Sequence, residues 1–238
     1  MNTILALDAS TDACSVALAQ SGATTSVFEL VPREHNHRLF SMLREVLPST
    51  PQASCIELIA FAQGPGSFTG LRVAASAAQG LAYTLDVPAV GLSSLACLAQ
   101  GSLRRGLLTS ADKALVMLDA RINEIYVGLY RFQDGLAVAC CPDQVVAPDA
   151  LPHDYLREHE DVVAMGSGLK YLDTLPVEVR RSILRVLADQ WPDSVDLLPL
   201  ARASADQGAL LTAAEIQPVY LRNEVNWKKL PEQGPQRG

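Results

Sequence analysis

Hydrophobic and polar positions follow a strand-like pattern over the first part of the chain. Residues 4–7 form an apolar run that stops at Asp8, and a second apolar stretch covers residues 14–19. Residues 24–31 alternate apolar and polar side chains, as a strand with one buried face does. Together these runs predict a meander of three strands, with a turn at Gly22 between the second and the third.

After residue 31 the spacing of the hydrophobic positions changes from every second residue to every third or fourth residue. Leu39, Leu43 and Val46 recur at helical spacing, so an amphipathic helix is expected from Asn36 up to the proline at position 48. A short apolar strand at residues 58–62 follows. It leads into a glycine-rich loop, an alanine-rich helix at 69–85, a strand at 87–92 and a helix capped by Ser93 or Ser94 that runs through Ala99.

The second half repeats the first. Placing Asp8 over Asp119 aligns residues 5–9 with residues 116–120 without a gap. Each copy reads as strand, acidic turn, strand, turn, strand. Such a repeated supersecondary unit indicates two lobes of similar build. The further elements expected in the second half are strands at 114–119, 125–132, 136–140 and 162–165 and a short helix at 150–158.

A glycine loop closes each copy, Gly64-Pro65-Gly66 in the first and Gly166-Ser167-Gly168 in the second. We therefore expect an α/β protein with an N-terminal lobe and a smaller, degenerate C-terminal lobe. A helix near the C-terminus is expected to complete the N-terminal lobe, and the last residues are expected to form a flexible tail. The predicted bounds are 1–105 and 106–199 for the lobes, 200–212 for that helix and 231–238 for the tail.

Composition narrows the class of protein. The chain has 238 residues, 49% of them hydrophobic and 19% charged, which suffices for a buried core without crosslinks. Its five cysteines show no metal-ligand spacing, and no apolar run reaches the roughly 20 residues that span a bilayer. We therefore expect a cytoplasmic protein with reduced thiols. A net charge of −7 with scattered cations argues against unaided binding of a nucleic acid.

A weak nucleotide site is one hypothesis for the two loops of the first lobe. Small residues at strand ends let backbone N–H groups approach phosphate, and an Asp can position a metal or a water. The residues concerned are Asp8, Ser10, Thr11, Gly64, Gly66 and Ser67. The alternative for 8–11 is an ordinary turn, which we favour from those four residues alone. In the second copy Arg121 and Ile122 replace Ser10 and Thr11, so a symmetric, hydrolysing ATP site is not expected.

No metal or catalytic centre is predicted. His35 and His37 stand two residues apart at a helix start, a spacing that points them away from each other, and we expect them to be exposed polar residues. The chain contains no HExxH, and no Ser-His-Asp arrangement suggests itself.

A partner interface is the second hypothesis, and it concerns the two helices of the first lobe. The helix after the glycine loop is rich in Ala, Ser and Gly, which permits close approach of another helix. Tight packing within the same lobe explains this composition equally well. The residues expected at an interface are Leu39, Phe40, Leu43, Val46, Leu71, Arg72, Ala74, Ala75 and Ala78. Under this hypothesis Leu39→Glu or Ala74→Arg would abolish pairing and leave the fold intact.

Several of these segments resemble the TsaB (YeaZ) family. They are spread over most of the chain, and Gly64-Pro65-Gly66-Ser67-Phe68-Thr69-Gly70-Leu71-Arg72 is the most specific of them. The other matching segments are residues 4–10, Gly80-Leu81-Ala82, Gly91-Leu92-Ser93-Ser94-Leu95, Asp119-Ala120-Arg121, Glu124-Ile125-Tyr126 and Pro218-Val219-Tyr220-Leu221-Arg222.

The resemblance implies an actin-like, heat-shock-ATPase-like duplicated fold of two lobes with mixed sheets. It also implies a non-catalytic subunit, with no catalytic residues or cofactor of its own, that takes part in forming threonylcarbamoyladenosine on tRNA. Such a subunit pairs with the catalytic subunit TsaD and works with the ATPase TsaE. It forms a homodimer when alone, meets tRNA only through the complex, and has no membrane partner. ATP and metal would then act on the partner subunits. The alternative is an autonomous ATP-dependent enzyme of the actin-like class.

Overall fold

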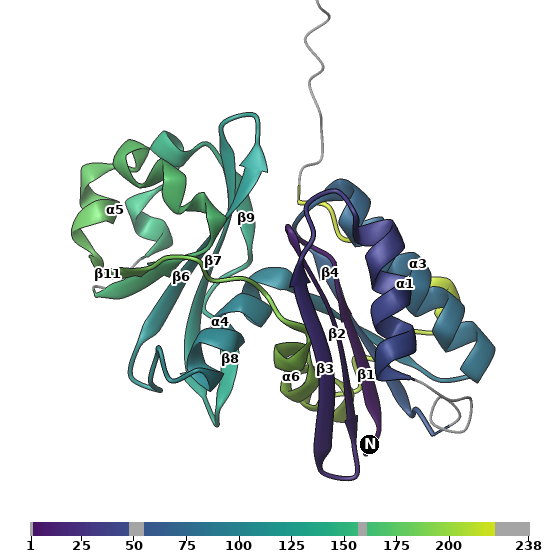
Figure 1. The fold of residues 1–238 in the computed structure, drawn as a ribbon. Coiled ribbons are helices and arrows are strands. Elements are labelled where there is room, and N and C mark those ends of the chain that lie inside the picture. The colour runs from purple at the N-terminus through teal and green to yellow at the C-terminus, as the bar shows by residue number, and fades with distance from the viewer. Residues whose placement is uncertain (1, 48–54, 157–160, 222–238) are drawn as a thin grey trace, which may run out of the picture.

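The structure is a computed structural model, and it describes residues 2–47, 55–156 and 161–221. Its first lobe is built on a five-stranded mixed sheet with the spatial order β3-β2-β1-β4-β5 (Figure 1). β1, β2 and β3 are antiparallel neighbours, whereas β4 and β5 run parallel to β1. The strands are β1 (Ile4–Asp8), β2 (Ala13–Gln20), β3 (Ala23–Leu30), β4 (Leu58–Gly64) and β5 (Ala89–Ser93).

The second lobe repeats this plan. Its main sheet has the order β8-β7-β6-β10-β11, with β9 paired to β7. Counted from the central hairpin outward, each strand therefore has its counterpart in the first sheet, and Asp8 and Asp119 both lie near the end of the first strand of their copy. The strands are β6 (Lys113–Arg121), β7 (Glu124–Gln133), β8 (Leu136–Ala139), β9 (Gln144–Val146), β10 (Val162–Met165) and β11 (Ile183–Leu187). The expected duplicated, actin-like α/β fold with two mixed sheets is confirmed.

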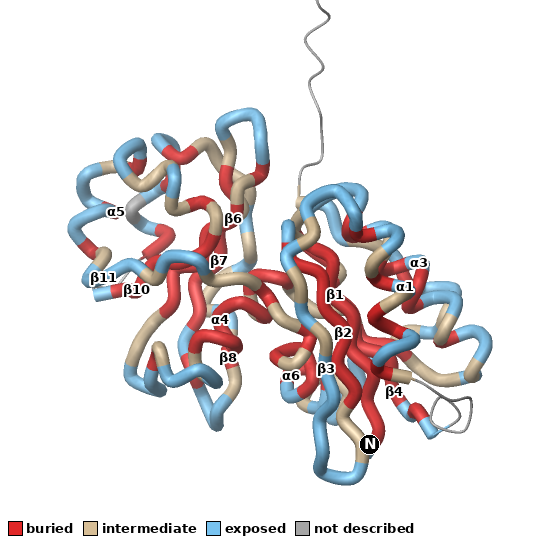
Figure 2. Tube along the Cα trace, in the orientation of Figure 1, coloured by how far each residue is buried: buried red, intermediate tan, exposed pale blue. Residues whose placement is uncertain are grey.

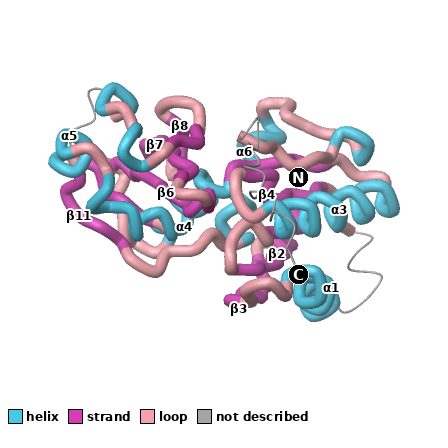
Figure 3. Tube along the Cα trace, turned by 90° about the horizontal axis from the view of Figure 1, so that it is seen from above, coloured by secondary structure: helices cyan, strands magenta, loops and turns pink. Residues whose placement is uncertain are grey.

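Helices cover both faces of the two sheets. α1 and α3 pack on one face of the first sheet, and α6 packs on its other face together with part of α4. α4 also packs on the second sheet, whose far face is covered by α5 and short 3-10 turns (Figures 1 and 3). The helices are α1 (His35–Val46), α3 (Phe68–Leu85), α4 (Ser94–Arg104), α5 (Val177–Arg181) and α6 (Ser194–Asp206), and the 3-10 turns are η1 (Pro148–Ala150), η2 (His153–Tyr155), η3 (Ser167–Thr174) and η4 (Ala213–Glu215).

The alternation of side chains along each central strand places apolar residues on both faces. In β1, Leu5 and Leu7 face α1 and α3, while Ile4 and Ala6 face α6. β1 is accordingly buried along its whole length and the neighbouring β2 and β4 over most of theirs, as Figure 2 shows in red. This explains why the sequence reads as continuous apolar runs there and as an alternating pattern in β3, which lies at the sheet edge.

Some predicted elements differ from those observed. α6 begins at Ser194, six residues before the expected start, with Asp193 as the N-cap that accepts from the N–H of Val195 at 3.1 Å. Pro199 lies inside this helix, and a proline usually marks a helix boundary in sequence reading. The helix expected at 150–158 is replaced by η1 and η2 in its described part.

Other elements had no clear signal in the sequence. They are β9, α5 and β11, all short and in the second lobe. The tail predicted at 231–238 lies outside the described residues. None of the helices that the structure describes is long and apolar enough to cross a membrane.

Candidate functional site: the glycine loop and the exposed side of α3

The loop between β4 and α3 packs directly against the turn between β1 and β2. The N–H of Ser67 donates to the carbonyl oxygen of Ser10 at 2.7 Å. A Cβ on Gly66 would overlap that same carbonyl, and a Cβ on Gly70 would overlap the carbonyl oxygen of Ala9. The glycines are therefore needed so that the chain can approach its own backbone.

The candidate nucleotide residues come together at this junction, but their polar groups mostly bond one another. Ser67 caps α3 by accepting from the N–H of Gly70 at 3.4 Å. Thr11 accepts from the N–H of Ala13 at 3.2 Å. The side chain of Ser10 is buried and donates to Asp8. The junction is thus a packed joint that fixes the start of α3 on the end of β1.

Asp8 is the most buried acidic group of this joint. Its Oδ1 accepts from the N–H and from the hydroxyl of Ser10, both at 2.7 Å. Its Oδ2 has no hydrogen-bond partner among the described residues. Burial raises the pKa of Asp8 from 3.8 to about 6; the bonds from Ser10 oppose this shift, and the nearby charge of Asp193 adds to it.

The equivalent Asp119 of the second lobe has a different environment. Lys170 Nζ lies 2.8 Å and Arg121 Nη1 3.3 Å from its Oδ2. Burial acts to raise the pKa of Asp119, but the hydrogen bond and charge of Lys170, with those of Arg121, outweigh it and lower the pKa. The hydroxyl of Ser167 accepts from the N–H of Asp119 at 3.0 Å, so the second glycine loop also packs on its own hairpin.

The turn after Asp119 is unlike its counterpart. Arg121, Ile122 and Asn123 adopt φ values of 64°, 52° and 56°, a left-handed conformation that a β-branched residue such as Ile122 rarely takes. Ile122 is exposed there. The turns that follow Asp8 and Asp119 have therefore diverged in charge and in backbone shape, in line with the replacement of Ser10 and Thr11 by Arg121 and Ile122.

Seven of the nine residues predicted at a partner interface are buried in the first lobe itself. Leu39 and Ala74, for example, have no exposed surface, and they belong to the core between α1, α3 and the sheet. For these residues the prediction is wrong, because the apolar side of each helix is the side that its own sheet covers. The residues concerned are Leu39, Leu43, Val46, Leu71, Ala74, Ala75 and Ala78. Phe40 and Arg72 are exposed.

His35 is also not where the sequence placed it. It is buried in the first turn of α1, and its Nε2 has no hydrogen-bond partner among the described residues, whereas His37 is exposed. No cluster of three or more potential metal ligands occurs in the described part of the chain.

The exposed side of α3 carries a different set of residues, which we call the α3 face. It consists of Phe68, Arg72, Ser76, Gly80 and Tyr83, spaced three or four residues apart. The two aromatic residues at its ends are 57% and 80% exposed, and the middle is formed by small residues. α1 lies beside α3 on the same side of the sheet (Figures 1 and 3) and adds the exposed Phe40.

Gly80 is the informative residue of the α3 face. A Cβ built on it meets no atom within 4 Å, so the fold of this chain does not require a glycine there. Glycine in a helix interior costs about 1 kcal/mol relative to alanine. Gly70 differs, because a Cβ there would overlap the carbonyl oxygen of Ala9; internal packing therefore requires a glycine at position 70 but not at position 80.

Arg72 packs on the ring of Phe68 and bonds the hydroxyl of Tyr220 at the start of the α3 face. Its Cζ is 3.7 Å from the ring centroid of Phe68 and 6.0 Å from that of Tyr220, and its Nε donates to the hydroxyl of Tyr220 at 3.0 Å. The two rings are 5.6 Å apart. Sequence reading named Arg72 but missed Tyr220, which approaches from a distant part of the chain.

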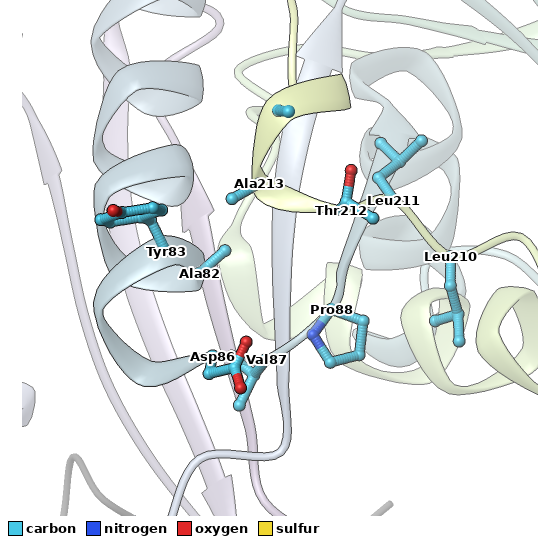
Figure 4. Close-up of a pocket in the computed structure, with 10 residues that line it drawn as sticks. Ala82, Tyr83, Asp86, Val87, Pro88, Leu210, Leu211, Thr212 and Ala213 are labelled. Atoms are coloured by element: carbon cyan, nitrogen blue, oxygen red, sulfur yellow. The ribbon is translucent and has the colours of Figure 1, made fainter.

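A pocket of about 440 Å³ adjoins the other end of α3 (Figure 4). The last turn of α3, the following residues Val87 and Pro88, and the segment 210–214 line it. Tyr83 belongs both to this pocket and to the α3 face. The surface available to another molecule therefore extends along the whole length of α3.

Comparisons with known proteins identify the family. The family model described as "TsaD: tRNA N6-adenosine threonylcarbamoyltransferase" matches residues 24–175. The tRNA threonylcarbamoyladenosine biosynthesis protein TsaB of Escherichia coli (strain K12) is 36% identical over 230 residues, which are 96% of this chain and 98% of that protein. The TsaB of Haemophilus influenzae is 33% identical over 245 residues, which cover 96% of this chain and 97% of that protein.

A solved structure agrees with this result. The structure titled "YeaZ from Pseudomonas aeruginosa" superposes with a TM-score of 0.83 at 35% sequence identity. The superposition covers 93% of this chain and 100% of that one. The chain therefore belongs to the TsaB family of tRNA threonylcarbamoyladenosine biosynthesis proteins.

Proposed function

We propose that the chain is a non-catalytic partner subunit in the formation of threonylcarbamoyladenosine on tRNA. It pairs with the catalytic subunit TsaD through the exposed sides of α1 and α3 and acts together with the ATPase TsaE. The same surface pairs two copies of the chain when TsaD is absent. The observation that carries this proposal is Gly80, an exposed helical glycine that its own fold leaves in open space.

The composition of the α3 face supports a protein partner. Aromatic and arginine side chains are enriched where protein interfaces gain most of their affinity, and small residues let two helices approach closely. Phe68 and Tyr83 lie at the two ends of the face, on either side of Ser76 and Gly80. A helix that runs along α3 over Ser76 and Gly80 would contact both aromatic residues and bury their exposed surface.

The packed glycine loop supports the absence of chemistry in this subunit. The N–H groups of Ser67 and Gly70, which could hold a phosphate at the start of α3, donate to Ser10 and Ser67 instead. We propose that ATP and metal act on the partner subunits and that tRNA is contacted through the complex. The net charge of −7 supports the latter.

Reconstitution tests the proposal. TsaD and TsaE of the same organism are mixed with tRNA, Mg-ATP and threonylcarbamoyl adenylate as the group donor, with and without this chain, and threonylcarbamoyladenosine is measured by mass spectrometry. We expect the modification to depend on the chain. Equal modification without it would contradict the proposal, and so would micromolar binding of Mg-ATP to the isolated chain in calorimetry, which favours an autonomous ATP-dependent enzyme.

A pair of matched variants tests the surface. Ser76→Arg places a long cation in the middle of the α3 face, and Ser110→Arg makes the same change at an exposed turn before β6. We expect Ser76→Arg to prevent association with TsaD in size-exclusion chromatography and Ser110→Arg to leave it unchanged. Normal association of the Ser76 variant would show that another surface is used.

A further inference from the structure

We propose that Arg72 is the residue by which this subunit selects its protein partner, and that the outward edge of its guanidinium binds a carboxylate side chain of that partner. This inference rests on the proposed docking through α3. It adds the chemistry of the group that the partner presents and the residue that recognises it.

The guanidinium of Arg72 is held in place before any partner arrives. One face lies 3.7 Å from the centroid of the Phe68 ring, and the hydroxyl of Tyr220 accepts from Nε at 3.0 Å. The Tyr220 ring is tilted by 35° to that of Phe68. An arginine fixed by cation–π contact and a hydrogen bond through Nε still presents its Nη donors to a ligand.

The residues that hold Arg72 are themselves anchored. Phe68 and Arg72 are four residues apart in the first turns of α3, which is fixed to the β1–β2 turn by the N–H of Ser67. Tyr220 follows Val219, whose N–H donates to the carbonyl oxygen of Gln63 at 2.8 Å. Because little side-chain freedom remains to be lost, binding at Arg72 carries a small entropic cost.

The charge of Arg72 is unmatched within the described structure. Other arginines form ion pairs: Arg38 with Glu29 and Glu45, and Arg104 with Asp193 and Asp196. Among residues 2–47, 55–156 and 161–221, no carboxylate forms an ion pair with Arg72. A planar guanidinium that is rigid, exposed and unpaired suits bidentate binding of a carboxylate.

The surroundings favour a protein carboxylate over a nucleic-acid phosphate. Surfaces that bind nucleic acid carry several cations, because each phosphate contact adds a further charge. On the α3 face Arg72 is the one cation, and its neighbours are the exposed rings of Phe68 and Tyr220, which are 57% and 42% accessible. An arginine among aromatic residues is typical of the centre of protein interfaces.

Three variants of Arg72 test the inference, with the affinity for TsaD of the same organism measured by calorimetry on the full chain. We expect Arg72→Lys to weaken association by roughly tenfold or more, nearly as much as Arg72→Gln, because a lysine cannot form the two parallel bonds. An affinity of Arg72→Lys within about twofold of the wild type would overturn the inference. Thermal unfolding of each variant reports whether the fold is kept.

Charge reversal tests the chemistry of the partner. Arg72→Glu should lose association, and one Asp or Glu to Arg substitution on the partner should restore it. If no single carboxylate of the partner restores binding, the assignment of a carboxylate is wrong. If Ser76→Arg leaves association intact, the proposed surface itself fails; if Ser76→Arg abolishes it and the Arg72 variants are neutral, only the present inference fails.

A carboxylate of the chain itself is the competing ligand for the guanidinium of Arg72, since the sequence after Leu221 contains Glu224 and Glu232. A chain ending at Leu221 serves as the second background for the same measurements. A loss of affinity on Arg72→Gln of similar size in both backgrounds supports the inference. A loss that disappears in the shortened chain would assign Arg72 to its own C-terminal segment instead.

Discussion

The hydroxyl of Ser93 donates to Oδ2 of Asp143 at 2.6 Å and thereby joins the two lobes. Ser93 ends β5 of the first sheet and caps α4, while Asp143 lies between β8 and β9 of the second lobe. The hydroxyl of Tyr130 donates to Oδ1 of the same carboxylate at 2.6 Å. Burial raises the pKa of Asp143, although both hydrogen bonds act to lower it.

We predict that Asp143→Ala destabilises the protein by about 2–3 kcal/mol, because it leaves the hydroxyls of Ser93 and of the buried Tyr130 without this acceptor. Tyr130→Phe should cost about 1 kcal/mol, since it removes the bond to Asp143 and the longer one to Ser93 at 3.2 Å but leaves Ser93 bound to Asp143. Urea unfolding measures both, with Asp149→Ala at an exposed position as control. A change below about 0.5 kcal/mol for Asp143→Ala would show that this network does not hold the lobes.

Asp8 should make the stability depend on pH in the acidic range. Its pKa is raised from 3.8 to about 6 in the folded state, so its contribution is complete below pH 4 and is lost as the pH rises through 6. A shift of two units corresponds to about 3 kcal/mol. Between pH 4 and pH 7 the wild type should therefore lose about 2–3 kcal/mol relative to Asp8→Asn, whose side chain does not titrate.

Urea unfolding at pH 4, 5, 6 and 7 checks this prediction. The exposed Asp173→Asn is the control, and it should follow the wild type. A constant difference between wild type and Asp8→Asn over the whole range would contradict the raised pKa.

The same substitution should have opposite effects at two glycines of α3. Gly80→Ala should stabilise the isolated chain by about 0.5–1 kcal/mol, since its Cβ enters open space in a helix. Gly70→Ala should destabilise it by about 1–3 kcal/mol, because its Cβ overlaps the backbone of Ala9. Thermal unfolding distinguishes the two. The measurement is made at a concentration at which the chain is monomeric, because a homodimer would use the same face. A destabilising effect of Gly80→Ala on the monomer would contradict the structural basis of the proposed docking face.

Substitutions on the two sides of α1 should also differ. Leu39 has no exposed surface, so Leu39→Glu buries a charge and should cost about 3 kcal/mol or more, which means loss of folding and not merely loss of pairing. Phe40 is 48% exposed, and Phe40→Glu should keep the fold and weaken association. Circular dichroism reports folding and size-exclusion chromatography reports association. A Leu39→Glu variant that is folded and monomeric would support the interface role predicted for Leu39 from the sequence.

Much of the fold could be predicted from the sequence because it depends on local periodicity. The apolar runs that end at Asp8 and Asp119 mark equivalent strands, and Ser93 is the cap of α4 as expected. The start of α6 could not be predicted, because Pro199 lies within the helix. Proline has no backbone N–H to donate within a helix, and the contacts of other α6 residues with the first sheet compensate for that missing hydrogen bond.

The candidate site could be predicted only in part. Leu39 and Ala74 were predicted at an interface because they are hydrophobic. Hydrophobic residues also form the core, where both of these lie, and only the packed structure shows which side of a helix is exposed. The spacing of Phe68, Ser76 and Tyr83 was visible in the sequence, yet no rule distinguishes an exposed docking stripe from an ordinary surface. Tyr220, which bonds Arg72, and Ser93, which bonds Asp143, come from distant parts of the chain, so no local pattern contains these pairs.

The two lobes share their strand order but not their helices. The first lobe carries α1 with 12 residues and α3 with 18, whereas the helix between β10 and β11 of the second lobe, α5, has 5. A partner that recognises α1 and α3 together would therefore find no equivalent pair of helices at the corresponding position of the second lobe, as far as the structure describes it. Attachment at one place gives closed pairs, since a chain of subunits that grows without end needs two different contact surfaces on each member. Under the proposed docking through α1 and α3, the unequal helices would limit the stoichiometry of assembly.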